Sequence, residues 1–151
     1  MIVLGLDPGI ARTGFGVINT SSQHLFVRCG CLTTPKHQSD EDRLLMLGED
    51  LEHLINDTHP DIAVVERVYF GNNSKTAMIT AQARGVLVYI LRKHHITVES
   101  LTPLQIKSRI TGYGAARKEQ IQAAVTQQLH LADIPQPDDA ADALAAALCV
   151  V

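Results

Sequence analysis

Short apolar runs and alternating patterns predict three β-strands in the first third of the chain. Ile2–Leu6 is an apolar run that ends at Asp-Pro-Gly, and Gly14–Ile18 and Leu25–Thr33 carry strand-like patterns between polar turns. Strands that follow one another through short connections are most simply antiparallel neighbours. We therefore expect an antiparallel meander at the N-terminal end of the chain.

The following segment changes to helical spacing. Ser39 and Asp42 have the spacing of an N-terminal capping pair, and Pro60 lies beyond the expected end of the helix. The apolar positions between them would pack on the sheet: Leu44, Leu47, Leu51, Leu54 and Ile55.

A strand, a helix and a second strand come next. Ile62–Val65 is a continuous apolar run, typical of a central strand buried on both faces, and it ends at Glu66. A segment from about Ser74 to His94 is rich in Ala, Leu and Ile and predicts a helix, and Ile96–Leu101 predicts another strand. Right-handed crossovers would make these later strands parallel.

Three shorter helices complete the chain. The first opens at Thr102-Pro103 and ends near Ile110. The second is marked by Ile121, Val125 and Leu129, which are four residues apart. The third is alanine-rich and begins near Asp138 or Asp139. This order of elements predicts a single α/β domain over residues 1–151 with a ribonuclease H-like fold. Its five-stranded mixed sheet would contain three antiparallel and then two parallel strands, with helices on both faces.

The composition is that of one soluble domain. The chain has 151 residues, of which 46% are hydrophobic, and no apolar run reaches the roughly 18 residues of a membrane span. With no N-terminal signal pattern, we expect a cytoplasmic protein. Cys29, Cys31 and Cys149 are an odd number, which favours reduced thiols; zinc would need further ligands, and two small buried side chains are the simpler interpretation of Cys29 and Cys31.

The net charge of −3 hides a division of charge along the chain. Between Arg67 and Lys118, nine Lys and Arg residues face one acid, Glu99, whereas the remaining segments hold four basic and fifteen acidic residues. A basic central segment between acidic segments indicates contact with a polyanion. The alternative is a solvated basic surface without a partner.

Four carboxylates stand at positions where they could meet. Asp7 and Glu66 each follow an apolar strand, and Asp139 and Asp142 lie three apart on one face of the last helix. Simpler explanations exist for each: a turn for Asp7, a solvated strand end for Glu66, and stabilisation by the helix dipole for the first-turn residues Asp138 and Asp139. The dipole explains Asp142 less well.

Together, the four carboxylates would form a cluster of oxygen ligands. Such a cluster is tolerable mainly when cations fill it, and oxygen-only ligands favour Mg²⁺, with Mn²⁺ as a substitute, over zinc. Two ions could activate water and stabilise the leaving oxygen of a phosphodiester.

Basic and aromatic residues of the middle segment are candidates for DNA contact. Arg117 and Lys118 follow Gly112-Tyr113-Gly114 at an expected helix start, where cations oppose the helix dipole but would attract a phosphate, and Lys107 is nearby. Tyr69 follows Glu66 in a turn-like stretch, where it could stack on an unpaired base. We expect Tyr69 rather than Phe70 to be the exposed aromatic.

At these positions the sequence strongly resembles the RuvC family of Holliday-junction resolvases, over nearly the whole chain. The motifs that carry the resemblance are Gly5-Leu6-Asp7-Pro8-Gly9 with Thr13-Gly14-Phe15-Gly16, Val65-Glu66, Gln82-Ala83-Arg84-Gly85, Gln105-Ile106-Lys107, Gly112-Tyr113-Gly114 with Lys118, and Asp139-Ala140-Ala141-Asp142-Ala143-Leu144-Ala145.

The resemblance implies a homodimeric, Mg²⁺-dependent endonuclease that nicks two strands of like polarity across a four-way DNA junction during recombination and repair. It implies a partnership with the branch-migration motor formed by RuvA and RuvB. It assigns the metal and catalytic roles to Asp7, Glu66, Asp139 and Asp142. DNA-backbone contacts would fall to Lys107 and Lys118, and the junction-opening aromatic to Tyr69, where the family more often has Phe. Asp138 is an additional acid beside Asp139.

Three alternatives compete with this interpretation. Asp7-Pro8-Gly9 with Thr13-Gly14 is similar to the phosphate-binding loop of actin-like and sugar-kinase-like ATPases, but that fold needs two such lobes. The others are a non-catalytic junction-binding module and a ribonuclease H-like nuclease with a different substrate.

Overall fold

The first three strands form the antiparallel meander that the alternating pattern predicts. In a computed structural model, which describes residues 1–23, 25–69 and 74–151, β1 (Ile2–Asp7) pairs antiparallel with β2 (Arg12–Asn19), and β2 pairs antiparallel with β3 (Phe26–Thr33). Asp7, expected just after the first strand, is its last residue.

The two later strands extend the sheet on the other side of β1. Strand β4 (Ile62–Glu66) lies parallel to β1, and β5 (Thr97–Leu101) lies parallel to β4, so that the strand order is β3-β2-β1-β4-β5. This mixed sheet confirms the predicted ribonuclease H-like fold.

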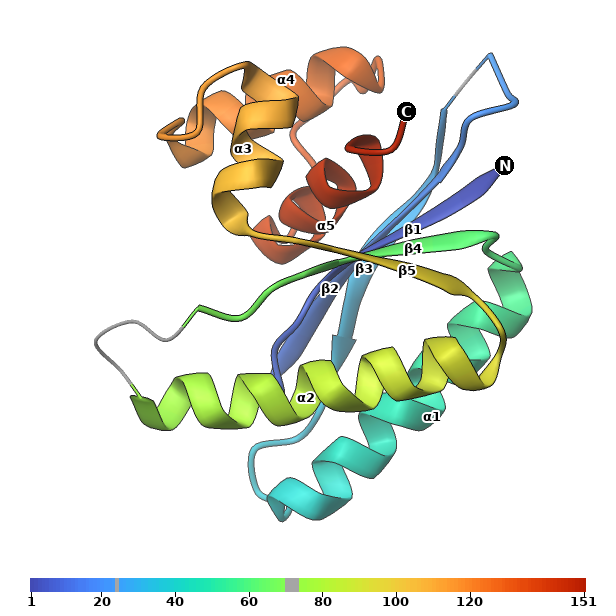
Figure 1. Cartoon of the computed structure of the whole chain (residues 1–151), viewed down its shortest axis with the longest axis vertical. Coiled ribbons are helices and arrows are strands. Elements are labelled where there is room, and N and C mark those ends of the chain that lie inside the picture. The colour runs from blue at the N-terminus through green and yellow to red at the C-terminus, as the bar shows by residue number, and fades with distance from the viewer. Residues whose placement is uncertain (24, 70–73) are drawn as a thin grey trace.

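Helices cover both faces of the sheet (Figure 1). One apolar cluster joins α1 (Asp40–Thr58) and α2 (Ser74–Lys93) to one face, and a second joins α3 (Pro103–Thr111), α4 (Lys118–Gln128) and α5 (Asp138–Leu148) to the other. The expected cap is present at α1, where Ser39 Oγ accepts the Asp42 N–H at 3.1 Å. None of the helices in the described part of the chain is long and apolar enough to span a membrane.

Glycines allow α5 to lie almost in contact with the backbone of β1 and β2. A Cβ atom on Gly5 would lie 1.9 Å from the carbonyl oxygen of Ala143, and one on Gly14 would lie 1.9 Å from that of Asp139. Any side chain at these positions would therefore push the helix away from the sheet. The close packing holds the first turns of α5 beside the end of β1.

Candidate active site

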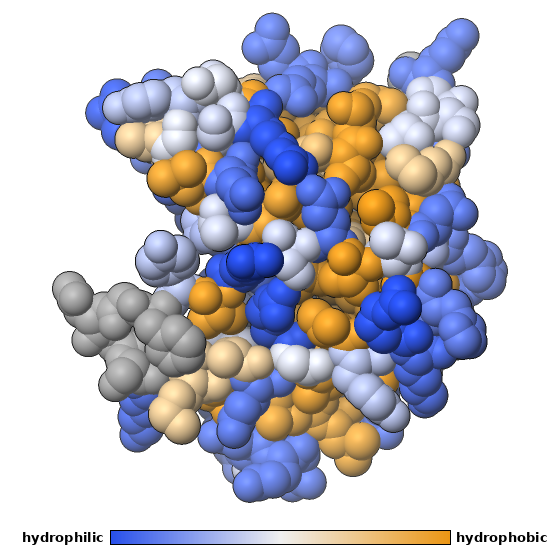
Figure 2. Space-filling view, viewed as in Figure 1, coloured by the Kyte–Doolittle hydropathy of each residue, from blue (hydrophilic) through white to orange (hydrophobic). Residues whose placement is uncertain are grey.

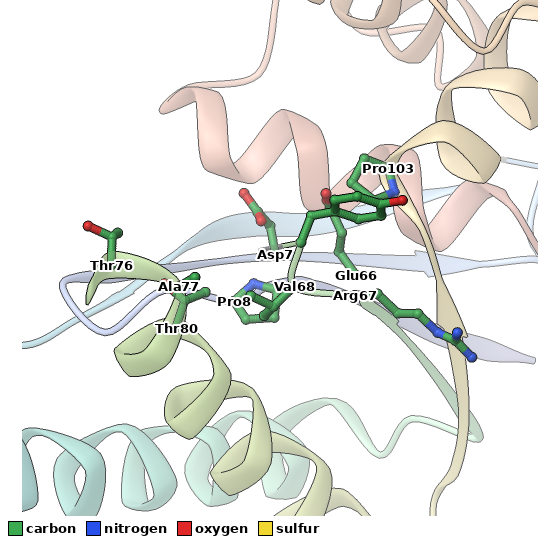
Figure 3. Close-up of a pocket in the computed structure, with 10 residues that line it drawn as sticks. Asp7, Pro8, Glu66, Arg67, Val68, Thr76, Ala77, Thr80 and Pro103 are labelled. Carbon is green, nitrogen blue, oxygen red and sulfur yellow. The ribbon is translucent and has the colours of Figure 1, made fainter. Parts of the chain in front are cut away.

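Asp7 and Glu66 lie side by side because they end neighbouring parallel strands. In the register of β1 and β4, Leu6 is opposite Val65, so the following residues meet at the same edge of the sheet. Their side chains point to the same side of the sheet (Figure 3). The sequence-based expectation that both acids stand at strand ends is therefore correct.

Helix α5 brings a third carboxylate to this edge. Asp142 lines the same hollow as Asp7 and Glu66, with a volume of about 260 Å³. Lys107, from α3, and Lys118, the first residue of α4, line it as well. Acids separated by 59 and 76 positions in the sequence thus meet in space, with two cations beside them.

Burial and mutual repulsion make these carboxylates hold protons more tightly than exposed acids. Burial, and then the neighbouring Glu66, Asp142 and Asp139, raise the pKa of Asp7 to about 8. Burial and then Asp142 raise the pKa of Glu66 to about 7, against an opposing effect of Lys107. The pKa of Asp142 is also raised by burial, although Lys118 opposes the shift. The negative charge of the cluster is therefore only partly compensated by the protein.

Asp139 and Asp138 have different surroundings. Asp139 Oδ2 is a buried atom that makes no hydrogen bond within the described residues, and Arg12 Nε forms an ion pair with it at 3.1 Å. Asp138 is exposed, and its two carboxylate oxygens are occupied by Lys118 Nζ at 2.8 Å and Gln122 Nε2 at 3.1 Å. Lys118 holds the pKa of Asp138 below its usual value. Asp139 is thus the member of this pair that acts electrostatically on Asp7.

The chemistry of these side chains fits a divalent ion that prefers oxygen ligands. Within residues 1–23, 25–69 and 74–151, no three acidic, histidine or cysteine side chains are gathered tightly enough to hold a metal as they stand. Carboxylates with raised pKa values repel one another, and a divalent cation between them would remove that repulsion. Asp7, Glu66 and Asp142 share one hollow and are the residues that could hold it.

Arg117 is separate from this hollow. It is the exposed residue before α4, and its backbone N–H donates to Gln120 Oε1 at 2.8 Å. The backbone N–H of Arg117 is therefore already occupied by the Gln120 side chain and is not free to bind a phosphate.

Tyr69 lies on the rim of a second hollow that adjoins the carboxylates. This hollow, of about 530 Å³, is lined by Asp7, Glu66 and Tyr69 among others. The Tyr69 side chain is 75% exposed, as expected for an aromatic that reaches out of the protein. The alternative aromatic, Phe70, lies outside the described residues.

Two arginines near the site were not among the residues predicted from sequence. Arg12 pairs with Asp139, and Arg84 donates a hydrogen bond to the backbone oxygen of Glu66 at 3.1 Å. A sequence signal existed for Arg84, which belongs to the Gln82-Ala83-Arg84-Gly85 motif. For Arg12 the only signal was its place directly before Thr13-Gly14.

Comparisons with known proteins match the chain to one family over nearly its whole length. The family model described as "Crossover junction endodeoxyribonuclease RuvC" matches residues 3–150. A relative of that description from Roseiflexus sp. (strain RS-1) is 46% identical over 147 residues, which are 97% of this chain and 88% of the relative. A second, from Natranaerobius thermophilus, is 45% identical over 150 residues, which are 99% of this chain and 93% of that protein.

Among solved structures, the chain is similar to Thermus thermophilus RuvC in complex with a Holliday junction substrate. The TM-score is 0.91 at 26% sequence identity, and the match covers 99% of this chain and 92% of the other.

Proposed function

Since this chain belongs to the RuvC family of crossover junction endodeoxyribonucleases, we propose that it resolves four-way DNA junctions by paired, Mg²⁺-dependent nicks in strands of like polarity. The observation that carries the proposal is the shared hollow of Asp7, Glu66 and Asp142 with Lys107 and Lys118 at its wall. Acids would hold the metal there while the lysines attract the DNA phosphate. Recombination and DNA repair are the processes that supply such junctions.

In this proposal Asp7, Glu66 and Asp142, with Asp139 beside them, hold two magnesium ions. When bound, the ions would activate the attacking water and stabilise the leaving oxygen of the phosphodiester. Lys107 and Lys118 orient the scissile strand through its phosphates, and Arg117 adds a more distant contact. The partly buried position of Asp7 and Glu66 strengthens the electrostatic interactions in the site because water is partly excluded.

Tyr69 is proposed to separate the strands at the junction centre. Its exposed ring stands on the rim of the cleft beside the carboxylates and offers a stacking face for an unpaired base. Equal cleavage of a mobile junction by wild type and by a Tyr69→Ala variant would exclude this role.

Paired nicks require two active sites, so we propose that the chain acts as a homodimer through α2. Met78 and Tyr89 are both more than three-fifths exposed. Their separation of 11 residues places them on one face of the helix. Both side chains are therefore available for contact with a second chain on that face of the helix. The proposal also includes the family's branch-migration motor, RuvA and RuvB, as the machinery that delivers the junction.

A nicking assay on synthetic four-way, three-way and linear duplex DNA tests the proposed function. We expect Mg²⁺-dependent cleavage of the four-way junction, with two symmetrically related nicks in each resolved molecule and little cleavage of the linear duplex. Sedimentation at the assay concentration should give the mass of two chains.

Three results would contradict the proposal in different ways. Equal cleavage of all three substrates would indicate a general nuclease, and tight junction binding without any nick in Mg²⁺ or Mn²⁺ would indicate a binding module. Full resolution by a species with the mass of one chain would contradict the dimer.

Magnesium binding should depend on pH because it must displace protons. In the metal-free protein the raised pKa values, about 8 for Asp7 and about 7 for Glu66, keep both acids largely protonated at pH 6. We therefore expect Mg²⁺ affinity to rise steadily between pH 6 and about 8.5, with proton release that calorimetry in buffers of different ionisation enthalpy can count. An affinity that is constant over this range, without proton release, would contradict the assignment of these acids as ligands.

The same groups set the pH dependence of stability without metal. Between their unfolded-state pKa values, near 4, and about 8, the native state binds more protons than the unfolded chain. The contribution of Asp7 and Glu66 to stability is therefore complete at low pH and is lost as the pH rises. Thermal unfolding in EDTA should show this decrease, and Mg²⁺ should oppose it.

A further inference from the structure

Two arginines line a hollow between the end of β4, helix α2 and strand β5. It is separate from the hollow that Asp7, Glu66 and Asp142 share. Arg67, Val68, Ala81, Arg84 and Ser100 surround this space of about 340 Å³. Figure 3 shows why it is distinct: Arg67 points away from Asp7 and Glu66, toward β5. Consecutive residues of an extended segment point to opposite sides, so the side chains of Glu66 and Arg67 point in different directions, although both residues also line the hollow that contains Tyr69.

Arg84 is held rigidly in this hollow. Its Nε donates to the backbone oxygen of Glu66 at 3.1 Å, and its Nη2 donates to Ser100 Oγ at 2.6 Å. These two bonds tie α2 to both β4 and β5. A guanidinium has five N–H donors, and within the described residues the others of Arg84 make no hydrogen bond. The side chain is therefore pre-oriented and still has donors for a ligand.

Arg67 adds a second positive charge that no acid neutralises in the described part of the chain. Four other arginines are paired with carboxylates, whereas Arg92 and Arg117 form no ion pair within the described residues. The four pairs are Arg12 with Asp139, Arg28 with Asp57, Arg43 with Asp40, and Arg109 with Glu99. Arg67 instead lies close enough to Arg84 that its charge, together with the burial of Arg84, lowers the pKa of Arg84. Two neighbouring guanidinium groups without a counter-ion form a ready site for an anion.

This hollow adjoins the hollow of about 530 Å³ in which the DNA would lie. Arg67 and Val68 line both this hollow and the cleft that contains Asp7, Glu66 and Tyr69. Strongly hydrophilic residues also gather in the centre of the molecular face viewed in Figure 2. A strand with one phosphate at the carboxylates could therefore continue past Val68 into the space between the two arginines.

We propose that Arg67 and Arg84 bind a backbone phosphate of the junction strand adjacent to the phosphate that is cut. This inference rests on the proposed function. Planar guanidinium groups match phosphate oxygens with paired, charge-assisted hydrogen bonds. Arg84 also contacts the carbonyl of Glu66, so a phosphate bound here holds the end of β4 and with it the backbone of a proposed metal ligand.

The salt dependence of binding tests the proposal directly. In EDTA, where no cleavage occurs, an Arg67→Ala variant should bind a four-way junction about tenfold more weakly than wild type at low salt, by the loss of one charge-assisted contact. Its plot of log affinity against log salt should be flatter by roughly 0.7–0.9, the contribution of one phosphate contact. The thermal stability of Arg67→Ala should not fall, because the Arg67 side chain forms no ion pair within the described residues. Its removal also takes away the repulsion between its positive charge and that of Arg84.

A matched control is available at the other end of α2. Arg92 is exposed and donates one hydrogen bond to a backbone oxygen, that of Ile96 at 3.0 Å, far from the carboxylates along the helix. Arg92→Ala should leave the salt dependence unchanged. Lys107→Ala, which removes a proposed phosphate contact from the carboxylate hollow, should flatten it as Arg67→Ala does.

Junctions with single neutral methylphosphonates identify the phosphate itself. Wild type should lose affinity at one position next to the cut site, and Arg67→Ala, which keeps only Arg84 for this phosphate, should lose clearly less at that position. An unchanged salt dependence for Arg67→Ala, or equal losses for both proteins at every position, would overturn the inference. Millimolar inorganic phosphate could also abolish the difference in junction affinity between wild type and Arg67→Ala. That result would assign the hollow to a small anion instead. In these cases nicking by wild type would still support the proposed function, whereas absence of junction binding would refute both.

Discussion

Replacement of Asp7 by Asn is expected to lower the rate of junction nicking by at least about 10³-fold, because loss of a proposed metal ligand would remove several kcal/mol of transition-state stabilisation. Junction affinity should remain near that of wild type, since Asp7 is an acid that repels the DNA phosphates. The variant should also be more stable than wild type without metal at pH 8.5, where the buried carboxylate of Asp7 is charged among other acids. A loss of cleavage could then not be explained by unfolding of the variant.

Single-turnover nicking, junction affinity and thermal unfolding should be measured on the same preparations. Glu66→Gln should behave like Asp7→Asn, because it occupies the neighbouring strand end. Asp138→Asn is the matched control: this acid is exposed and already engaged by Lys118 and Gln122, so most of the nicking activity should remain. Undiminished cutting by Asp7→Asn in Mg²⁺ would contradict the proposed site, and a collapse of activity in Asp138→Asn would transfer the ligand role from Asp139 to Asp138.

Replacement of Gly5 by Ala is expected to destabilise the protein by about 3 kcal/mol or more, at the upper end of the cost of overpacking a core. The new Cβ would lie 1.9 Å from the Ala143 oxygen and 2.7 Å from the Ala147 nitrogen. Both are backbone atoms of α5, so no side-chain rotation can relieve the clash. The helix must move away from β1, and Asp142 and Asp139 must move with it.

Denaturant unfolding measures the expected loss, and Mg²⁺ calorimetry should show weakened binding by the folded fraction. Gly48→Ala is a suitable comparison because Gly48 is also buried, yet its new Cβ would meet only side-chain atoms: Val86 Cγ1 at 3.3 Å, and two carbons of Ile90 at 3.7 and 3.8 Å. We expect a change in stability below about 1 kcal/mol for Gly48→Ala, since a valine methyl can adjust and alanine favours the helix. Equal stability changes for the two variants would show that α5 is not held against β1 as described.

Much of the site could be predicted from the sequence, because the end of an apolar run identifies the end of a strand. An apolar run that stops at Asp7 or Glu66 must leave its acid at the edge of a sheet, since an isolated charge inside the core is too costly. The helical spacing of Asp139 and Asp142 likewise places both on one face of α5. Exposure of Tyr69 followed from its place after the buried strand.

The cations were less predictable than the acids. Arg117 and Lys118 are neighbours in the sequence, but only Lys118 lines the carboxylate hollow. Arg12 pairs with an acid 127 positions away, and the juxtaposition of Arg67 and Arg84 depends on the packing of α2 against β4 and β5. Long basic side chains take the direction that distant charges and local burial favour, and neither is visible in a local pattern.

The sequence by itself determined the order and type of the elements, and with them which acids would end strands, because hydrophobic periodicity is a local property of the chain. Only the tertiary structure decided how closely α5 approaches β1 and β2, and therefore that Asp142 shares a hollow with Asp7 and Glu66. It also decided which arginines pair with an acid and which, such as Arg67, have no acidic partner in the described residues. Both outcomes depend on contacts between residues far apart in the chain, where packing distance and electrostatic repulsion act across elements.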